Sequence, residues 1–172
     1  MITGGKMGRT AVILLGAGLL AGCGAAQPSA RAVLAEASRI EFGSPGYLCA
    51  DTLAAAKQHQ VDYEQVVNGC LSRNRQSLRT FFWLSKNAGF DGAAAEGHAA
   101  VSGILLRSLG DQFFGECLAG EPVPIRNAVR DHLLYDLGYG ATELTLAEIK
   151  KQYPRTFPGD WTTDNPVEAT QP

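Results

Sequence analysis

The sequence predicts an all-α domain of about seven or eight short helices. Apolar residues recur at spacings of three and four, glycine and proline interrupt the chain at short intervals, and strict alternation of apolar and polar residues is rare. β-Branched residues, which favour strands, are also sparse. Short helices that end at glycines fit either an irregular α-solenoid-like stack of antiparallel pairs or a compact helical bundle.

The predicted helices span about residues 30–40, 47–59, 62–73, 75–87, 91–109, 111–120, 125–137 and 145–153. Residues 43–46, Gly-Ser-Pro-Gly, form a turn between the first two helices. Asp62 and Gln65 have the spacing of a capping box, which opens the third helix. Gly89 is placed as the C-cap of the fourth helix.

Similar signals bound the later helices. Asp91 and Gly110 bound the fifth helix, and Asp111 and Gly120 bound the sixth. Residues 121–124 precede the seventh helix, and Gly138 follows it. The capping-box pair Thr145 and Glu148 opens the last helix. The prolines at 154, 158, 166 and 172 then indicate an extended tail over residues 154–172, which Phe157 and Trp161 dock onto the domain.

Two of these helices have unusual compositions. The fifth is rich in alanine, glycine and serine, so we expect it to be central, crossed at close range by the helix that carries Phe81–Leu84. Four consecutive apolar residues cannot share one helix face. Either that helix is buried on several sides, or part of the run is an exposed surface that binds a partner.

The amino terminus has the layout of a secretory signal. Lys6 and Arg9 precede an apolar run over residues 11–21, which has about half the roughly 20 apolar residues that a membrane-spanning helix needs. The run closes with Leu-Ala-Gly-Cys at residues 20–23, and this motif resembles the lipobox of bacterial lipoproteins. Translation from either Met1 or Met7 keeps a positive charge before the run.

The resemblance implies lipidation of Cys23 and cleavage before it. Residues 1–22 would be the signal peptide, 23–29 a lipidated tether, and 30–153 the helical domain. Two or more acyl chains anchor a protein stably, so the chain would bind a membrane through Cys23. Gly24 follows the cysteine, which favours the outer membrane, facing the periplasm. The six residues 24–29 reach about 20 Å, so the domain would lie close to the bilayer.

Three further cysteines remain in the mature chain. Cys49 and Cys70 are equidistant from the turn between the second and third helices, so in an antiparallel hairpin they lie at the same height and a disulfide is favoured over two buried thiols. Such a bridge would contribute about 3 kcal/mol. Cys117 is the odd thiol and is interpreted as a buried structural residue.

No motif indicates catalysis, a metal or a cofactor. His59, His98 and His132 lack the i, i+4 spacing of helical zinc sites, and the default interpretation of His132 is a hydrogen-bonded, half-buried residue. Nucleophile-elbow, P-loop and dinucleotide-binding signatures are missing from the sequence. We therefore predict no catalytic residues, metal or cofactor.

The charge balance argues against nucleic acid as a partner. Without residues 1–22, which hold two basic residues and no acidic one, 13 basic and 17 acidic side chains leave a net charge of −4. The leading hypothesis is a non-enzymatic envelope lipoprotein with a helical interaction or scaffold module and a protein partner. The alternatives are a periplasmic immunity or inhibitor protein against an effector, and an envelope hydrolase whose site is assembled across helices.

Overall fold

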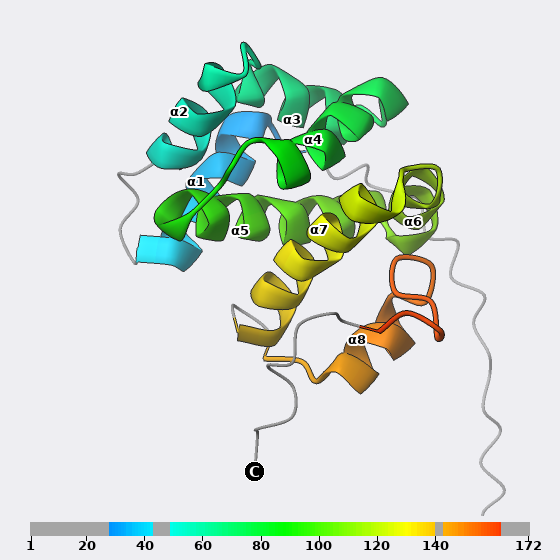
Figure 1. Cartoon of the computed structure of the whole chain (residues 1–172). Coiled ribbons are helices and arrows are strands. Elements are labelled where there is room, and N and C mark those ends of the chain that lie inside the picture. Colours follow the sequence, from blue (N-terminus) through cyan, green and yellow to red (C-terminus); the bar gives the residue numbers. More distant parts are fainter. Residues whose placement is uncertain (1–27, 43–48, 140–142, 163–172) are drawn as a thin grey trace, which may run out of the picture.

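Helix α5 (Gly92–Leu109) runs through the middle of the domain, and the other helices pack around it (Figure 1). The computed structural model describes residues 28–42, 49–139 and 143–162. The remaining elements are α1 (Ala30–Phe42), α2 (Ala50–Gln58), α3 (Tyr63–Leu71), α4 (Arg75–Asn87), α6 (Asp111–Ala119), α7 (Val123–Leu134), the π-helix η1 (Tyr135–Tyr139) and α8 (Leu146–Gln152). The predicted all-α class is confirmed, and within the described ranges every regular element is helical.

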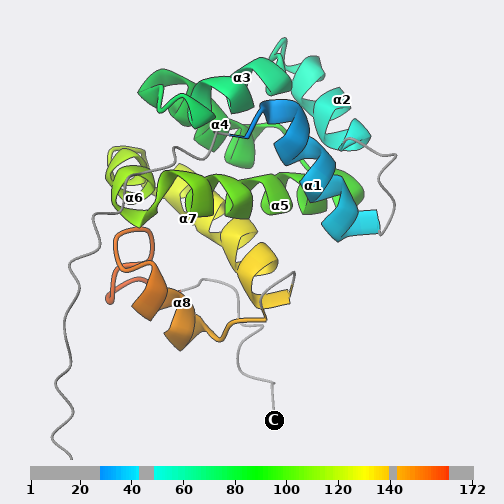
Figure 2. The ribbon, with the colours of Figure 1, turned by 180° about the vertical axis from the view of Figure 1, so that it is seen from behind.

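The helices form a compact bundle rather than a linear stack. Helix α5 contacts α1, α2, α3, α6, α7 and η1. Some of these elements, such as α6, adjoin α5 along the chain, whereas others, such as α1, are distant from it in sequence. Figures 1 and 2 show α1 to α4 grouped on one side of α5 and α8 on the other, with α7 crossing α5. A solenoid repeat would contact only its sequence neighbours, so the bundle is the correct one of the two predicted architectures.

Small side chains give α5 its central position, as predicted. Its buried residues include Gly97, Ala99, Ala100, Ser102 and Gly103, so neighbouring backbones can approach closely. Crossing by α4 was expected, but α4 packs mainly on α3 and α7. It reaches α5 through the ring of Phe81, which stacks on His98 with centroids 4.5 Å apart.

The run 81–84 is mainly a core feature. Phe81, Phe82 and Leu84 are fully buried, whereas Trp83 is 39% exposed and lies edge-on to the ring of His59. Three of the four residues therefore fill space between α4 and its neighbours. Only Trp83 reaches the surface, so the buried interpretation holds for the other three residues.

Local capping sets several helix ends as predicted. Asp62 accepts a hydrogen bond from the Gln65 N–H, and Thr145 and Glu148 form a reciprocal capping box. Asn74 is a cap that was not predicted: its side-chain oxygen accepts hydrogen bonds from two backbone N–H groups in the first turn of α4. At the start of α1, the N–H of Ala30 donates to Asn68 Oδ1 at 2.9 Å, which joins the first helix to α3.

Residues 153–162, which follow α8, pack onto the domain. Phe157 is fully buried, Trp161 is 8% exposed, and their rings meet at 5.4 Å. Arg130 Nε donates to the carbonyl of Thr156, and its guanidinium lies 5.5 Å from the Trp161 ring centroid. Docking by these two aromatic residues therefore agrees with the prediction, and residues 153–162 form turns in place of an extended segment.

Candidate functional site

An open groove lies between α2 and the segment that leads into α5. Its volume is about 580 Å³, within the range of small-ligand sites. The lining residues are Asp51, Ala54, Ala55, Gln58, Ala88, Gly89, Asp91, Gly92, Ala93 and Ala94. Most of them are alanine or glycine, so the walls consist largely of backbone and methyl groups.

Helix α2 presents one face to the groove and buries another. Asp51, Ala54, Ala55 and Gln58 are spaced i, i+3, i+4 and i+7, which places them on one stripe. On the other side, Thr52 is fully buried, and its hydroxyl donates to the carbonyl of Ala94 at 3.0 Å. This hydrogen bond fixes the position of α2 relative to the first turn of α5.

The segment between α4 and α5 depends on two glycines. Gly89 and Gly92 have φ angles of 64° and 44°, a region that side chains rarely adopt. A Cβ atom built on either glycine would meet nothing within 4 Å, so both face open space. These glycines allow the chain to turn sharply at the end of α4 and leave the groove unobstructed.

Two carboxylates supply the charge of the groove. Asp51 lies in the first turn of α2, and Asp91 is the N-cap residue of α5. An N-cap aspartate usually accepts a hydrogen bond from the first turn of its helix, but the Asp91 side chain makes no such bond. Neither carboxylate has an ion-pair or hydrogen-bond partner within the described ranges, and no basic residue lines the groove.

A buried aromatic and polar cluster supports the groove from below. Phe90 lies between two lining residues, and its ring stacks on His98 with centroids 4.5 Å apart. Phe81 stacks on His98 at the same distance, and Tyr63 meets its edge. His98 is therefore held in one orientation by rings from three other segments of the chain.

Both ring nitrogens of His98 make hydrogen bonds. The Tyr63 hydroxyl lies 2.8 Å from Nδ1, and Ser85 Oγ lies 2.8 Å from Nε2. Burial, followed by the neighbouring Cys49 and Cys70 thiols, raises the pKa of the Tyr63 phenol well above its usual value, so the phenol keeps its proton. If Tyr63 donates to Nδ1, then Nε2 carries the ring proton and donates to Ser85.

In this arrangement the polar hydrogens of Tyr63, His98 and Ser85 each have an acceptor. The Ser85 hydroxyl is then free to donate to the carbonyl of Phe81 at 3.5 Å. In the opposite tautomer the hydrogen of Tyr63 would have no acceptor, at a cost of about 1–3 kcal/mol. His98 therefore donates to Ser85 instead of accepting its proton, whereas a serine nucleophile needs a base that accepts. The geometry orders the core and does not activate Ser85.

The second histidine of the cluster is also held neutral. His132 lies 5.0 Å from His98, ring centroid to ring centroid, and its Nε2 donates to the carbonyl of Ser85 at 3.3 Å. Burial lowers the pKa of His132, with a smaller opposing effect of that hydrogen bond. Burial, and then the nearby His132, lowers the pKa of His98 well below its usual value. The half-buried, hydrogen-bonded position of His132 agrees with its sequence interpretation.

The predicted disulfide between Cys49 and Cys70 is wrong. None of the three described cysteines forms a disulfide. The prediction assumed that Cys49 lies within the second helix, but α2 begins one residue later. Cys49 instead adopts a left-handed conformation (φ 49°). Its backbone N–H donates to Ser38 Oγ at 2.7 Å, and its thiol is directed toward the carbonyl of Leu34 in α1.

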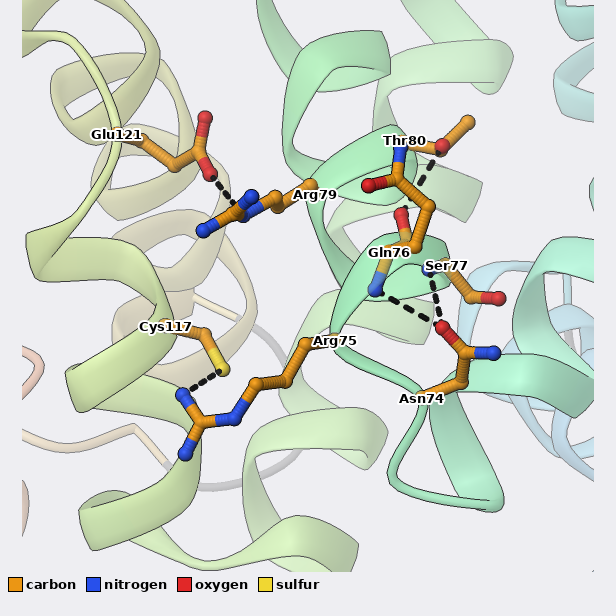
Figure 3. Close-up of polar contacts among 8 residues, drawn as sticks. All are labelled: Asn74, Arg75, Gln76, Ser77, Arg79, Thr80, Cys117 and Glu121. Carbon is orange, nitrogen blue, oxygen red and sulfur yellow. Dashed lines mark hydrogen bonds and ion pairs between the residues drawn. The ribbon is translucent and has the colours of Figure 1, made fainter.

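The other two cysteines are buried in different surroundings. Burial raises the pKa of Cys70 to about 12. Cys117 accepts a hydrogen bond from Arg75 Nη1 at 3.4 Å, and Arg79 pairs with Glu121 beside it (Figure 3). Burial raises the pKa of Cys117, and the two arginines oppose this only in part. The thiol is therefore protonated, which agrees with the structural role predicted for Cys117.

Sequence reasoning did not identify the groove. Cys23, the predicted lipidation site, lies outside the described residues. The sequence signal for the groove was a stripe on the second predicted helix, formed by Asp51, Ala54, Ala55 and Gln58. This stripe is not apolar enough to be buried in a core, and it is not strongly charged either. Small residues on a half-exposed stripe leave a hollow when a second element passes nearby.

Two features are absent from the described residues. No group of three or more His, Cys, Asp or Glu side chains there is arranged to hold a metal ion. Among the helices described, none combines the length and apolar character needed to cross a membrane.

A comparison of the chain with protein-family models, curated proteins and solved structures finds no match.

Proposed function

We propose that this protein is a lipid-anchored cell-envelope protein whose helical domain binds a partner protein through the groove between α2 and α5. The anchor would be Cys23, at the end of the lipobox-like motif. Residues 24–29 would then hold the domain within about 20 Å of the bilayer. The proposed role is that of a helical interaction module on the periplasmic side of the outer membrane.

The observation that carries this proposal is the pair of unpartnered carboxylates in a preformed hollow. Elsewhere in the described chain, carboxylates such as Glu121 and Asp136 pair with arginines. Asp51 and Asp91 have no such partners, although they line the same groove. Polar groups that converge in a concave site are the usual mark of a binding site.

Anchoring and binding can be tested separately. Metabolic labelling with an alkyne fatty acid should label the wild-type chain and not Cys23→Ser, and only the wild type should fractionate with outer membranes. Equal labelling and fractionation of the two proteins would contradict the anchor.

Site-specific photo-crosslinking in cells tests the groove. A photoreactive residue at Ala54, which is exposed on the groove stripe, should give a discrete adduct. The same residue at Glu64, exposed on α3 outside the groove, is the matched control and should not. An adduct of equal yield at both positions, or at neither, would count against a groove partner. Identification of the adduct separates an envelope component from an incoming effector.

A further inference from the structure

We infer that a phosphate group binds at the junction between α7 and the turns that follow α8. The donors are Arg126 and Arg130 of α7, together with Thr156 and Trp161 of the turns. None of these residues lines the groove between α2 and α5, so the inference goes beyond the proposed function and does not depend on it. It rests on a buried arginine without a counter-ion and on buried donors that lack acceptors among the described residues.

Arg130 is a buried cation without a carboxylate partner. It is buried more deeply than any other arginine or lysine in the described ranges. Its Nε donates to the carbonyl of Thr156, but none of the ion pairs between described residues includes it. Burial, followed by the charge of Arg126, lowers the pKa of Arg130, and the exposed Asp160 opposes this in part. An unpaired buried charge is costly, so this position favours an anion.

The junction also collects buried polar atoms without partners. Among the described side chains, the buried nitrogen and oxygen atoms that make no hydrogen bond are Arg126 Nε, Thr156 Oγ1 and Trp161 Nε1. Guanidinium and indole N–H groups only donate hydrogen bonds. The partner that would satisfy them must therefore be an acceptor.

The three atoms belong to residues that surround Arg130. Arg126 precedes it by four positions, which places both guanidinium groups on one face of α7. The Arg130 guanidinium lies 5.5 Å from the centroid of the Trp161 ring, and its Nε bonds to the Thr156 carbonyl at 2.7 Å. One face of a helix and one turn therefore supply donors to the same place from two sides.

The turn that carries Thr156 and Trp161 is fixed from outside the junction. The Asp111 carboxylate accepts hydrogen bonds from the backbone N–H groups of Arg155 and Thr156 at 2.8 and 2.9 Å. Lys150 Nζ donates to the carbonyl of Trp161 at 2.6 Å. Figure 1 shows this orange and red segment between α8 and α6. The donors are thus held in place before a ligand arrives, which lowers the entropic cost of binding.

A phosphate group fits these donors better than a water molecule or a carboxylate. Water carries no charge and cannot offset two guanidinium groups. A carboxylate is planar, whereas a phosphate directs its acceptor oxygens in several directions and pairs with arginine through parallel N–H···O bonds. Gly159 leaves space beside the turn, because a Cβ atom there would meet nothing within 4 Å.

NMR of the isotope-labelled, full-length chain in non-ionic detergent micelles tests the inference. Inorganic phosphate, chloride and acetate are titrated separately at constant pH and ionic strength. Phosphate should shift the indole N–H signal of Trp161 saturably, and chloride should not. Acetate, with its smaller charge, should bind at least about threefold more weakly. Trp83, whose ring lies against His59, supplies an indole signal that should stay unchanged.

Two variants assign the binding to these donors. Arg126→Gln removes one guanidinium from a partly exposed position, so the chain should fold and phosphate binding should weaken about tenfold. Trp161→Phe keeps an aromatic ring without the N–H, and binding followed at the Gly159 amide should weaken about five- to tenfold. Arg31→Gln is the matched control, since it removes an exposed guanidinium from α1, and it should change nothing.

Three results would overturn the inference. They are equal effects of chloride and phosphate on the Trp161 indole, tighter binding of acetate than of phosphate, and unchanged phosphate binding in both Arg126→Gln and Trp161→Phe.

Two further probes identify the source of the phosphate group. Glycerol 3-phosphate carries the group in solution, and phosphatidic acid in the same micelles presents it at a lipid surface. Tighter binding of phosphatidic acid, weakened by Arg126→Gln, would support a lipid headgroup as the ligand. Equal or tighter binding of glycerol 3-phosphate, with the same sensitivity, would support a soluble phosphate ester.

Discussion

The Tyr63 hydroxyl and His98 Nδ1 lie 2.8 Å apart, and this buried hydrogen bond joins α3 to the middle of α5. Tyr63 is 1% exposed and His98 is fully buried, so neither group has water as an alternative partner. The bond fixes the His98 ring, and the ring in turn supports Phe90 under the groove.

Removing the Tyr63 hydroxyl should destabilise the domain. Tyr63→Phe leaves the buried His98 Nδ1 without a partner, so the free energy of unfolding should fall by about 1–3 kcal/mol. Tyr153→Phe is the matched control. Among the described residues its hydroxyl accepts only from the adjacent Gln152, in a partly buried position, and its loss should cost less than about 1 kcal/mol. Chemical denaturation measures both. Equal costs would show that the Tyr63 bond has no special role.

Acid should destabilise the domain through its buried histidines. In the unfolded chain, His98 and His132 bind protons near pH 6.5, whereas burial lowers both pKa values in the folded state. Below about pH 6.5 the unfolded state therefore binds more protons, and the free energy of unfolding falls with pH by up to about 1.4 kcal/mol per unit per histidine.

Denaturation at pH 7.5, 6.5, 5.5 and 5.0 measures this dependence. His132→Gln should reduce the slope between pH 6.5 and 5.0, because one of the two buried titrating groups is gone. A wild-type stability that stays level over this interval would contradict the assignment of neutral buried imidazoles.

Gly103 should not tolerate a side chain. A Cβ atom there would overlap the Asp136 carboxylate, which is 3% exposed and pairs with Arg107 at 2.9 Å. Gly103→Ala must displace this buried pair, so it should cost at least about 2 kcal/mol. Gly120→Ala is the control, since its Cβ would meet only the Cys117 carbonyl at 3.5 Å. Thermal unfolding should show a clearly lower melting temperature for Gly103→Ala and almost no change for Gly120→Ala.

Thr52 should control the first turn of α5. Thr52→Val keeps the shape of the side chain but removes the hydrogen bond to the Ala94 carbonyl, at a cost of about 1 kcal/mol. Hydrogen exchange should become faster at the amides that line the groove in α5. Thr80→Val, which removes a local and exposed bond to Gln76, should leave that exchange unchanged. Equal exchange in both variants would exclude Thr52 as the link between the helices.

Helix ends were the most predictable part of the fold, because their causes are local. Asp62 and Thr145 cap helices through residues within three positions, and such short-range bonds can be recognised from spacing alone. The π-helix was not predicted. Gly138 indicated a helix end, whereas η1 continues α7 and places Asp136 against Gly103, a contact across 33 residues of sequence.

The candidate site was less predictable because distant segments build it. The groove needs α2 and the segment before α5 at a set distance, and the Thr52–Ala94 bond that sets this distance spans 42 residues. The disulfide prediction failed for a related reason. Equal spacing from a turn places two cysteines at one height only if both lie within the hairpin, and Cys49 lies outside α2.

The absence of a disulfide among the described cysteines has a consequence for how the domain is made. No step of its assembly waits for oxidation or for the exchange of mispaired bridges, which take seconds to hours. Packing around α5 alone closes the structure. The described part of the chain therefore reaches its folded state without an oxidant, through packing alone.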